Sequence, residues 1–142
     1  MKIKFRRLHE DAMIPAYKHD DDACCDLYTI EDMVLNPGDR ALMRTGVAIE
    51  IPTGWEVQIR PRSGIALAHG LSVLNAPGTI DSQYRNELMV LLINLGGLPV
   101  EITKGDRIAQ MCLKPVYKMN FIEVESLSDS ERGLGGWGST GK

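Results

Sequence analysis

The chain has 142 residues, a formal net charge of −3 and 44% hydrophobic residues, which fits one folded domain and excludes a disordered protein. Its 16 basic side chains against 19 acidic ones argue against a general nucleic-acid binder, which needs a surplus of positive charge. No apolar run approaches the roughly 20 residues that span a bilayer, and the basic residues 1–10 lack the apolar stretch of a signal peptide. With three cysteines and no export signal, we expect free thiols and a cytoplasmic protein.

Alternation of apolar and polar residues predicts most elements to be β-strands. Residues 3–6, 47–51 and 55–60 alternate with a period of two, which is typical of strands buried on one face. Residues 88–93 are continuously apolar, so we expect this strand to be covered on both faces, by its own domain or by a neighbouring subunit. Glycine, proline, asparagine and aspartate predict turns between the runs, at 36–39, 52–54, 75–78, 96–97 and 104–106.

One segment breaks this pattern. Residues 63–70 begin with Ser63 as a candidate N-cap, continue through alanine and leucine, and end at Gly70, which predicts one short helix. The other elements indicate an all-β barrel or sandwich of short strands. The tail from Glu131 onward contains five glycines without a repeat, and we expect it to be a mobile arm.

The tail also carries residues suited to binding phosphate. It matches half of a Walker A loop but lacks the following Ser or Thr and the helix, so that interpretation is rejected. Its glycines would still let backbone N–H groups approach phosphate oxygens, and Arg132 would grip phosphate with its planar fork. The alternative is a disordered solubilising tail. Trp137 favours a ligand-covering role, because a large aromatic side chain needs a flat surface to cover.

Three other segments allow a functional and a structural interpretation. Arg62, placed before the positive end of the predicted helix, indicates an anion site, or else a surface ion pair. Asp81 follows a Pro-Gly turn and is a candidate general base, with Tyr84 as a platform for a flat ligand; otherwise both serve the turn and the core. The acidic run 20–22 with Asp26 would suit a hard divalent ion, or is a solvated loop; zinc is disfavoured by the cysteine spacing.

Together with residues 105–110, these segments resemble the five sequence motifs of the homotrimeric dUTPases, the dUTP diphosphatases. Each motif is weak alone, but five in order at compatible spacing are a specific signal that spans residues 23–141. In chain order the matching segments are 23–27, 61–66, 78–85, 105–110 and 132–141.

The resemblance implies a β-barrel-like jelly-roll subunit with one short helix, assembled into a homotrimer whose active sites are shared between subunits. It implies hydrolysis of dUTP to dUMP and pyrophosphate, by Mg²⁺-assisted attack of water on the α-phosphorus. The expected division is a barrel over residues 1–130 and a Gly-rich arm, 131–142, that closes over the site. Expected partners are dUTP and further copies of the chain, without a membrane or direct nucleic-acid binding.

Roles follow by position in the motifs. Asp81 is expected to orient and deprotonate the attacking water, and Asp26 to hold Mg²⁺ through water. Uracil and sugar would be read by the hairpin residues Asn75, Thr79 and Ile80, by Tyr84 beneath the deoxyribose, where a 2′-hydroxyl would clash, and by the pocket residue Met89. The phosphate contacts would be Arg62, Ser63, Gly64, Gln110 and, from the tail, Arg132, Gly138, Ser139 and Thr140, with Trp137 stacking over uracil.

The chain departs from the family pattern at a few positions. Cys24 and Asn86 each stand where a glycine is common, and Asn86 would tolerate a left-handed turn.

Two alternatives to the dUTPase function are a dCTP deaminase-like enzyme of the same fold and a phage-derived protein that binds a regulator. The deaminase needs a catalytic glutamate, whereas the third motif has Asp81 followed by Ser82. The complete Gly-rich fifth motif also favours dUTP hydrolysis over deamination, whereas binding of a regulator could coexist with catalysis and is not excluded by the sequence.

Overall fold

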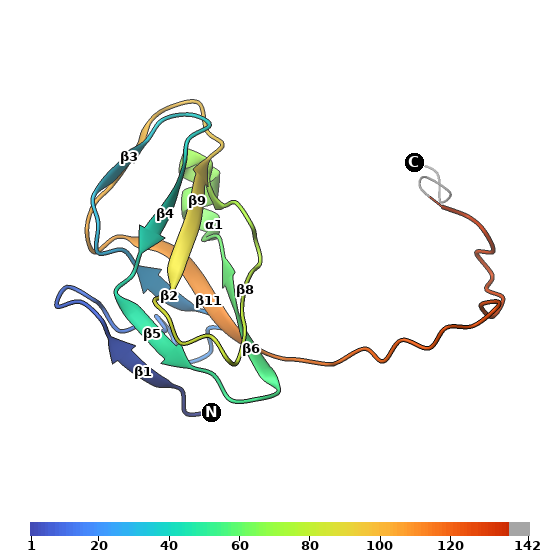
Figure 1. Ribbon diagram of the computed structural model, residues 1–142. Helices are drawn as coiled ribbons and strands as arrows, with labels where there is room; N and C mark the ends of the chain where they lie inside the picture. The colour runs from blue at the N-terminus through green and yellow to red at the C-terminus, as the bar shows by residue number, and fades with distance from the viewer. Residues whose placement is uncertain (137–142) are drawn as a thin grey trace.

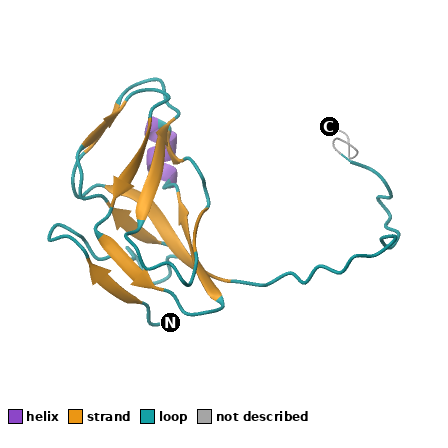
Figure 2. Cartoon of the chain, in the orientation of Figure 1, coloured by secondary structure: helices purple, strands orange, loops and turns teal. Residues whose placement is uncertain are grey.

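This computed structural model describes residues 1–136, which contain eleven strands and one short helix (Figure 1 and Figure 2). In chain order they are β1 (Lys4–Arg7), β2 (Cys25–Tyr28), β3 (Met33–Leu35), β4 (Arg40–Arg44), β5 (Val47–Glu50), β6 (Trp55–Arg60), α1 (Ser63–His69), β7 (Leu71–Val73), β8 (Gly78–Ile80), β9 (Met89–Asn94), β10 (Val100–Ile102) and β11 (Arg107–Pro115). The expected all-β fold with one short helix is confirmed.

The strands pair antiparallel in four small sheets. The largest has the order β2-β11-β6-β8, and a second has the order β4-β9-β7, while β1 pairs with β5 and β3 with β10. Strands distant in sequence are therefore neighbours, since β11 lies between β2 and β6. Alternate side chains of these sheets point inward and form one core. Its largest fully buried side chains include Leu27, Met43, Ile51, Leu88, Leu92 and Ile108.

The apolar run 88–93 is covered on only one face by its own chain. Val90, Leu92 and Asn94 of β9 are buried, whereas Met89, Leu91 and Ile93 are half-buried. The strand prediction is confirmed, and its outer face is left partly open within one subunit.

The N-cap of the helix lies one residue before the position that the sequence predicted. Arg62 is the N-cap, with extended backbone and no capping side-chain bond, and Ser63 is the first helical residue, so the prediction that Ser63 caps the helix was wrong. The predicted stop is confirmed, because Gly70 takes the left-handed conformation with φ of 70° and its N–H bonds to the carbonyl of Ala66. The backbone of Gly96 approaches Gly70 so closely that a Cβ there would collide with it.

The chain leaves the folded body after β11. Val116 still donates to the carbonyl of Gly54, at 2.9 Å, but residues 117–136 form no helix or strand and extend away from the sheets (Figure 1). Large apolar side chains along this segment are exposed, with Phe121 at 83% and Leu127 at 87%. Within residues 1–136, no helix has the length and apolar character needed to cross a membrane.

Candidate active site

The first candidate pocket has a volume of about 310 Å³ and lies where β2, β11 and the start of α1 meet. Five of the residues predicted from the motifs line it together. Asp26 and Gln110 stand directly opposite each other on β2 and β11, and the Gln110 amide donates to the carbonyl of Pro61 at 2.8 Å, which ties β11 to the connection before α1. We call this the arginine pocket; the predicted residues lining it are Asp26, Arg62, Ser63, Gly64 and Gln110.

Two arginines share one aspartate in the arginine pocket. Arg62 Nε lies 2.9 Å from one oxygen of Asp26, and Arg107 NH1 lies 3.1 Å from the other. Arg62 also donates to the backbone carbonyl of Arg107 at 3.1 Å. The Asp26 side chain is only 15% exposed, so these charge-assisted bonds fix its orientation. The two guanidinium groups carry one more charge than Asp26 neutralises, which suits an anionic ligand.

Arg107 reaches this pocket because of a β-bulge. The pairing of β11 with β2 shifts between Arg107 and Ala109, so that Arg107, rather than Ile108, stands opposite Tyr28. Since side chains alternate along a strand, this shift places Arg107 on the same face as Asp26 and Gln110. Arg107 is a residue that the sequence interpretation missed. Lys18 and His19, which also line the pocket, were missed as well.

The arginine pocket contains two carboxylates that are candidate metal ligands. Asp22 and Asp26 are the carboxylates among its lining residues, and both oxygens of Asp26 already face arginines. Within residues 1–136 no three His, Cys, Asp or Glu side chains gather closely enough to coordinate a metal. Among the described residues the pocket therefore offers carboxylate oxygens, the kind of ligand that Mg²⁺ takes, but no complete set of side-chain ligands.

Cys24 lines this pocket and Cys25 follows it in β2, and the pKa of each thiol is raised. Burial raises the pKa of the Cys24 thiol, and the neighbouring Cys112 raises it further. Burial raises the pKa of Cys25 to about 11.

A second pocket, of about 180 Å³, lies at the hairpin that joins β7 to β8. β7 pairs with β9 and β8 pairs with β6, so the two arms of the hairpin belong to different sheets. Both strands are at the edges of their sheets, which leaves backbone N–H and C=O groups unpaired and available to a ligand. We call this the hairpin pocket; the predicted residues lining it are Asn75, Thr79, Ile80 and Met89.

Asp81 and Tyr84 follow the hairpin on an exposed loop and line neither pocket. Within residues 1–136 the Asp81 carboxylate has no hydrogen bond or ion pair, which leaves it available to a water molecule. Tyr84 is 37% exposed, and its hydroxyl donates to the backbone carbonyl of Glu87 at 2.8 Å. Asn86 does not use the left-handed conformation that asparagine tolerates, since no non-glycine residue described has a positive φ.

The structure of one chain does not bring all the predicted residues together. The arginine pocket and the hairpin pocket share no lining residue. Arg132 lies in the extended tail, where it donates to the carbonyl of Gly136 at 3.1 Å, and it lines neither pocket. Trp137, Gly138, Ser139 and Thr140 lie outside the described residues.

Comparison with known proteins identifies the chain's relatives. The dUTPase family model matches residues 10–141. The chain is 56% identical over 142 residues to the deoxyuridine 5'-triphosphate nucleotidohydrolase of Nautilia profundicola, covering 100% of both chains. It is 54% identical over 140 residues to the protein of the same name from Clostridium tetani, covering 99% of this chain and 97% of the other.

Solved structures with the same fold are dUTPases. The Staphylococcus bacteriophage 80alpha dUTPase with dUPNHPP superposes with a TM-score of 0.91 at 28% identity, covering 99% of both chains. A mutant dUTPase from phage phi11 of S. aureus, with a structural Mg(II) ion, has a TM-score of 0.81 at 25% identity, covering 91% of this chain and 100% of the other. The expected jelly-roll fold is thereby confirmed. With matches of this extent in both sequence and structure, the chain belongs to the dUTPase family.

Proposed function

We propose that this chain hydrolyses dUTP to dUMP and pyrophosphate at sites shared between the subunits of a homotrimer. The observation that carries the proposal is the pairing of Asp26 with Arg62 and Arg107 in a pocket that also holds Ser63, Gly64 and Gln110. This pocket offers cationic and neutral donors to a phosphate chain. The chain is acidic overall, so folding has to gather these cations for a highly charged substrate.

In the proposed mechanism Arg62, Ser63, Gly64 and Gln110 bind the phosphate chain. Arg107 keeps the Asp26 carboxylate in place from the other side, at 3.1 Å. Asp26 is the residue that would hold Mg²⁺ through water, and the ion, when bound, neutralises charge on the triphosphate. The chain's contribution to the phosphate end is therefore positioning and charge, which is what phosphoryl chemistry requires.

The hairpin pocket is proposed to read the base. The edges of β7 and β8 present backbone donors and acceptors, and Asn75 adds a side-chain amide. Distinguishing uracil from cytosine is a matter of donor and acceptor placement, so these groups can reject the wrong base. Thr79 and Ile80 supply the backbone of β8, and Met89 supplies an apolar wall.

Asp81 is proposed to orient the attacking water and to take its proton. A carboxylate in hydrogen-bond reach of water acts as a general base, and the side chain of Asp81 makes no competing contact within residues 1–136. Tyr84 is proposed to lie under the deoxyribose, where a 2′-hydroxyl would collide with its ring.

A homotrimer is proposed because one chain presents the site in separate parts. The two pockets share no residue, the outer face of β9 is partly open, and residues 117–127 expose apolar side chains. Assembly would cover these surfaces. The tail 131–142, with Arg132, Trp137, Gly138, Ser139 and Thr140, is proposed as an arm that closes over the nucleotide and excludes water, beside a barrel of residues 1–130.

Pyrophosphate release from dUTP, dCTP, dTTP and UTP, each with Mg²⁺ and again with excess chelator, tests this function. We expect release from dUTP far above that from the other three nucleotides, and its loss when the metal is removed. Comparable release from all four, or uracil nucleotide formed from dCTP, would contradict the proposal. The dCTP arm separates it from the deaminase-like alternative.

A further inference from the structure

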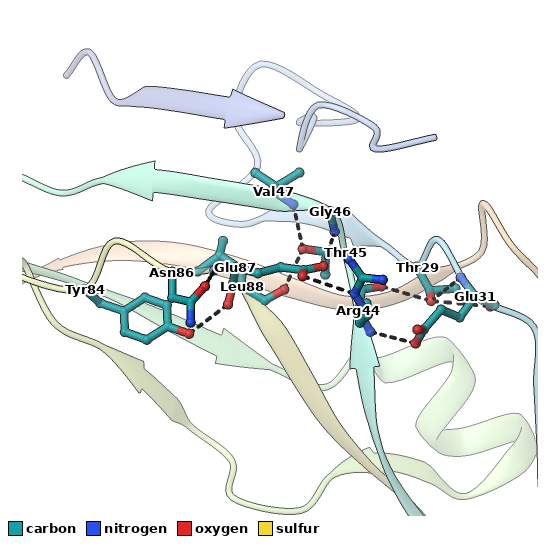
Figure 3. Close-up of polar contacts among 10 residues, drawn as sticks. All are labelled: Thr29, Glu31, Arg44, Thr45, Gly46, Val47, Tyr84, Asn86, Glu87 and Leu88. Atoms are coloured by element: carbon teal, nitrogen blue, oxygen red, sulfur yellow. Dashed lines mark hydrogen bonds and ion pairs between the residues drawn. The ribbon is translucent and has the colours of Figure 1, made fainter. Parts of the chain in front are cut away.

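The ring of Tyr84 is anchored at one point. Its hydroxyl donates to the backbone carbonyl of Glu87 at 2.8 Å (Figure 3), and within residues 1–136 its side chain makes no other hydrogen bond. The loop from Asp81 to Asn86 is mostly exposed, and it holds the Tyr84 backbone through two bonds, one from the Tyr84 N–H to the carbonyl of Asp81 at 3.0 Å and one from Arg85 to the Tyr84 carbonyl at 2.9 Å. The Glu87 carbonyl is therefore the hydrogen-bond partner that fixes the hydroxyl end of the Tyr84 ring.

Glu87 is held from both its backbone and its side chain. Its N–H donates to the Asn86 side chain at 2.8 Å. One carboxylate oxygen accepts from the N–H of Gly46 at 2.7 Å, and the other accepts from Arg44 Nε at 3.1 Å (Figure 3). The Glu87 side chain is only 9% exposed. Its bonds are therefore shielded from bulk water and are stronger than the same bonds at the surface.

The turn that receives Glu87 is itself fixed. Leu88 donates to the carbonyl of Val47 at 2.7 Å, and Thr45 donates to the carbonyl of Leu88 at 2.6 Å. Gly46 has φ of 69°, and a Cβ there would meet Ala12 at 2.8 Å, so the turn requires glycine. Its other side is tied to the loop after β2, because Glu31 accepts from the backbone N–H of Arg44 at 3.1 Å.

Burying a carboxylate costs free energy of hydration, so stability alone does not explain why a carboxylate holds this loop. A packed apolar side chain would hold residue 87 in the core without the loss of hydration that a carboxylate suffers. What the carboxylate adds is direction, because its two oxygens meet donors from two different residues, Arg44 and Gly46. These bonds fix the orientation of the Glu87 side chain, next to a peptide that the Leu88 N–H holds through the carbonyl of Val47.

We propose that Glu87 is a positioning residue for substrate selection: its clamped carboxylate fixes the backbone carbonyl that holds Tyr84, and this sets how strongly the site prefers deoxyribose to ribose. The inference rests on the proposed function, which places Tyr84 beneath the sugar. A ring held by its hydroxyl cannot retreat from a 2′-hydroxyl. A ring released from that bond can move aside and admit a ribonucleotide.

The test measures kcat/KM for dUTP and for UTP in the wild type, Tyr84→Phe, Glu87→Gln and the double variant. Because one hydrogen bond is lost, we expect the dUTP-to-UTP ratio to fall by about 3- to 10-fold in each single variant. If Glu87 acts through Tyr84, the double variant should lose no more selectivity than Tyr84→Phe alone. Ile102→Val, a buried change in β10 that lines neither pocket, controls for a general loss of stability and should keep the wild-type ratio.

The outcomes separate the inference from the function on which it rests. A wild type that does not hydrolyse dUTP overturns the proposed function. A wild type that prefers dUTP, with an unchanged ratio in Tyr84→Phe or additive losses in the double variant, overturns the role of Glu87. If Glu87→Gln does not fold, Arg44→Gln takes its place, since it removes one clamp from a side chain that is 42% exposed; an unchanged ratio there overturns the role equally.

Discussion

Asp81 is exposed at the end of β8, and its carboxylate has no partner within residues 1–136. Because it supports no other group, Asp81→Asn should leave folding intact while removing the proposed base. We expect the rate of pyrophosphate release to fall by roughly 10³-fold, with an unchanged melting temperature. Binding of a non-hydrolysable dUTP analogue, measured by calorimetry, should stay within a few-fold of wild type. Turnover near the wild-type rate would remove Asp81 from the mechanism.

Cys25 gives the stability of the fold a dependence on alkaline pH. Burial raises the pKa of this thiol from 9.0 to about 11, so the folded state disfavours its thiolate and the unfolded state does not. The stabilisation is present below pH 9 and is lost as the pH rises from about 9 to about 11. Urea unfolding across this range should show a declining free energy, with a smaller decline in Cys25→Ala. Equal declines in both proteins would assign the effect to other groups.

At the scale of single elements, Gly70 limits how the helix can end. It has φ of 70° and lies against the backbone of Gly96, so Gly70→Ala combines a strained backbone with a steric clash. Gly38→Ala is a matched control, because Gly38 has φ of 83° and open space around it. We expect Gly38→Ala to cost about 1 kcal/mol of unfolding free energy and Gly70→Ala several times more, measured by urea unfolding. Equal costs would show that the contact with Gly96 is unimportant.

The strands were predictable wherever side chains alternate. Residues 47–51 and 55–60 have a period of two, and both form strands, β5 and β6. The motifs also predicted which residues share one pocket, because Asp26, Arg62 and Gln110 do line it together, while their roles stay predictions. The place of Arg107 in this pocket was not predictable. The bulge in β11 interrupts the alternation of side chains from which the face of a strand residue is predicted.

Other features lay beyond local sequence patterns. The N-cap was assigned to Ser63 from residue preference, but Arg62 occupies it, where its guanidinium is engaged by Asp26. The position of Glu87 depends on Gly46 and Arg44, about 40 residues earlier in the chain. Only tertiary structure brings such partners together. The one sequence feature that could have pointed to Glu87 was an acidic residue directly before an apolar run.

At the scale of the whole molecule, the tail lies apart from the folded body. Residues from 117 to 136 form no helix or strand, and Arg132 lines neither pocket. Ending the chain after Glu131 should therefore leave the folded body unchanged and remove most of the activity, because the proposed arm could no longer close over the nucleotide. Circular dichroism and pyrophosphate release would measure both effects. An unchanged rate would rule out a catalytic role for the tail.

Because the arginine pocket and the hairpin pocket are separate within one chain, variants of each pocket can test whether two subunits form one active site together. Asp81→Asn keeps the arginine pocket, and Arg62→Gln keeps the hairpin and Asp81. In the proposed trimer each site takes its arginine pocket and its hairpin from different subunits, so co-assembled variants can combine two intact parts. Each variant alone should be inactive, and its inactivity should not depend on concentration.

The most direct measurement is the activity of trimers that are unfolded and refolded together from equal amounts of Asp81→Asn and Arg62→Gln chains. If subunits mix at random, the account predicts recovery of about a quarter of the wild-type rate of pyrophosphate release per site, because half of the chains offer each intact part. Mass spectrometry would confirm that mixed trimers formed. Mixed trimers without recovered activity would show that both parts act within one chain and would contradict the shared site.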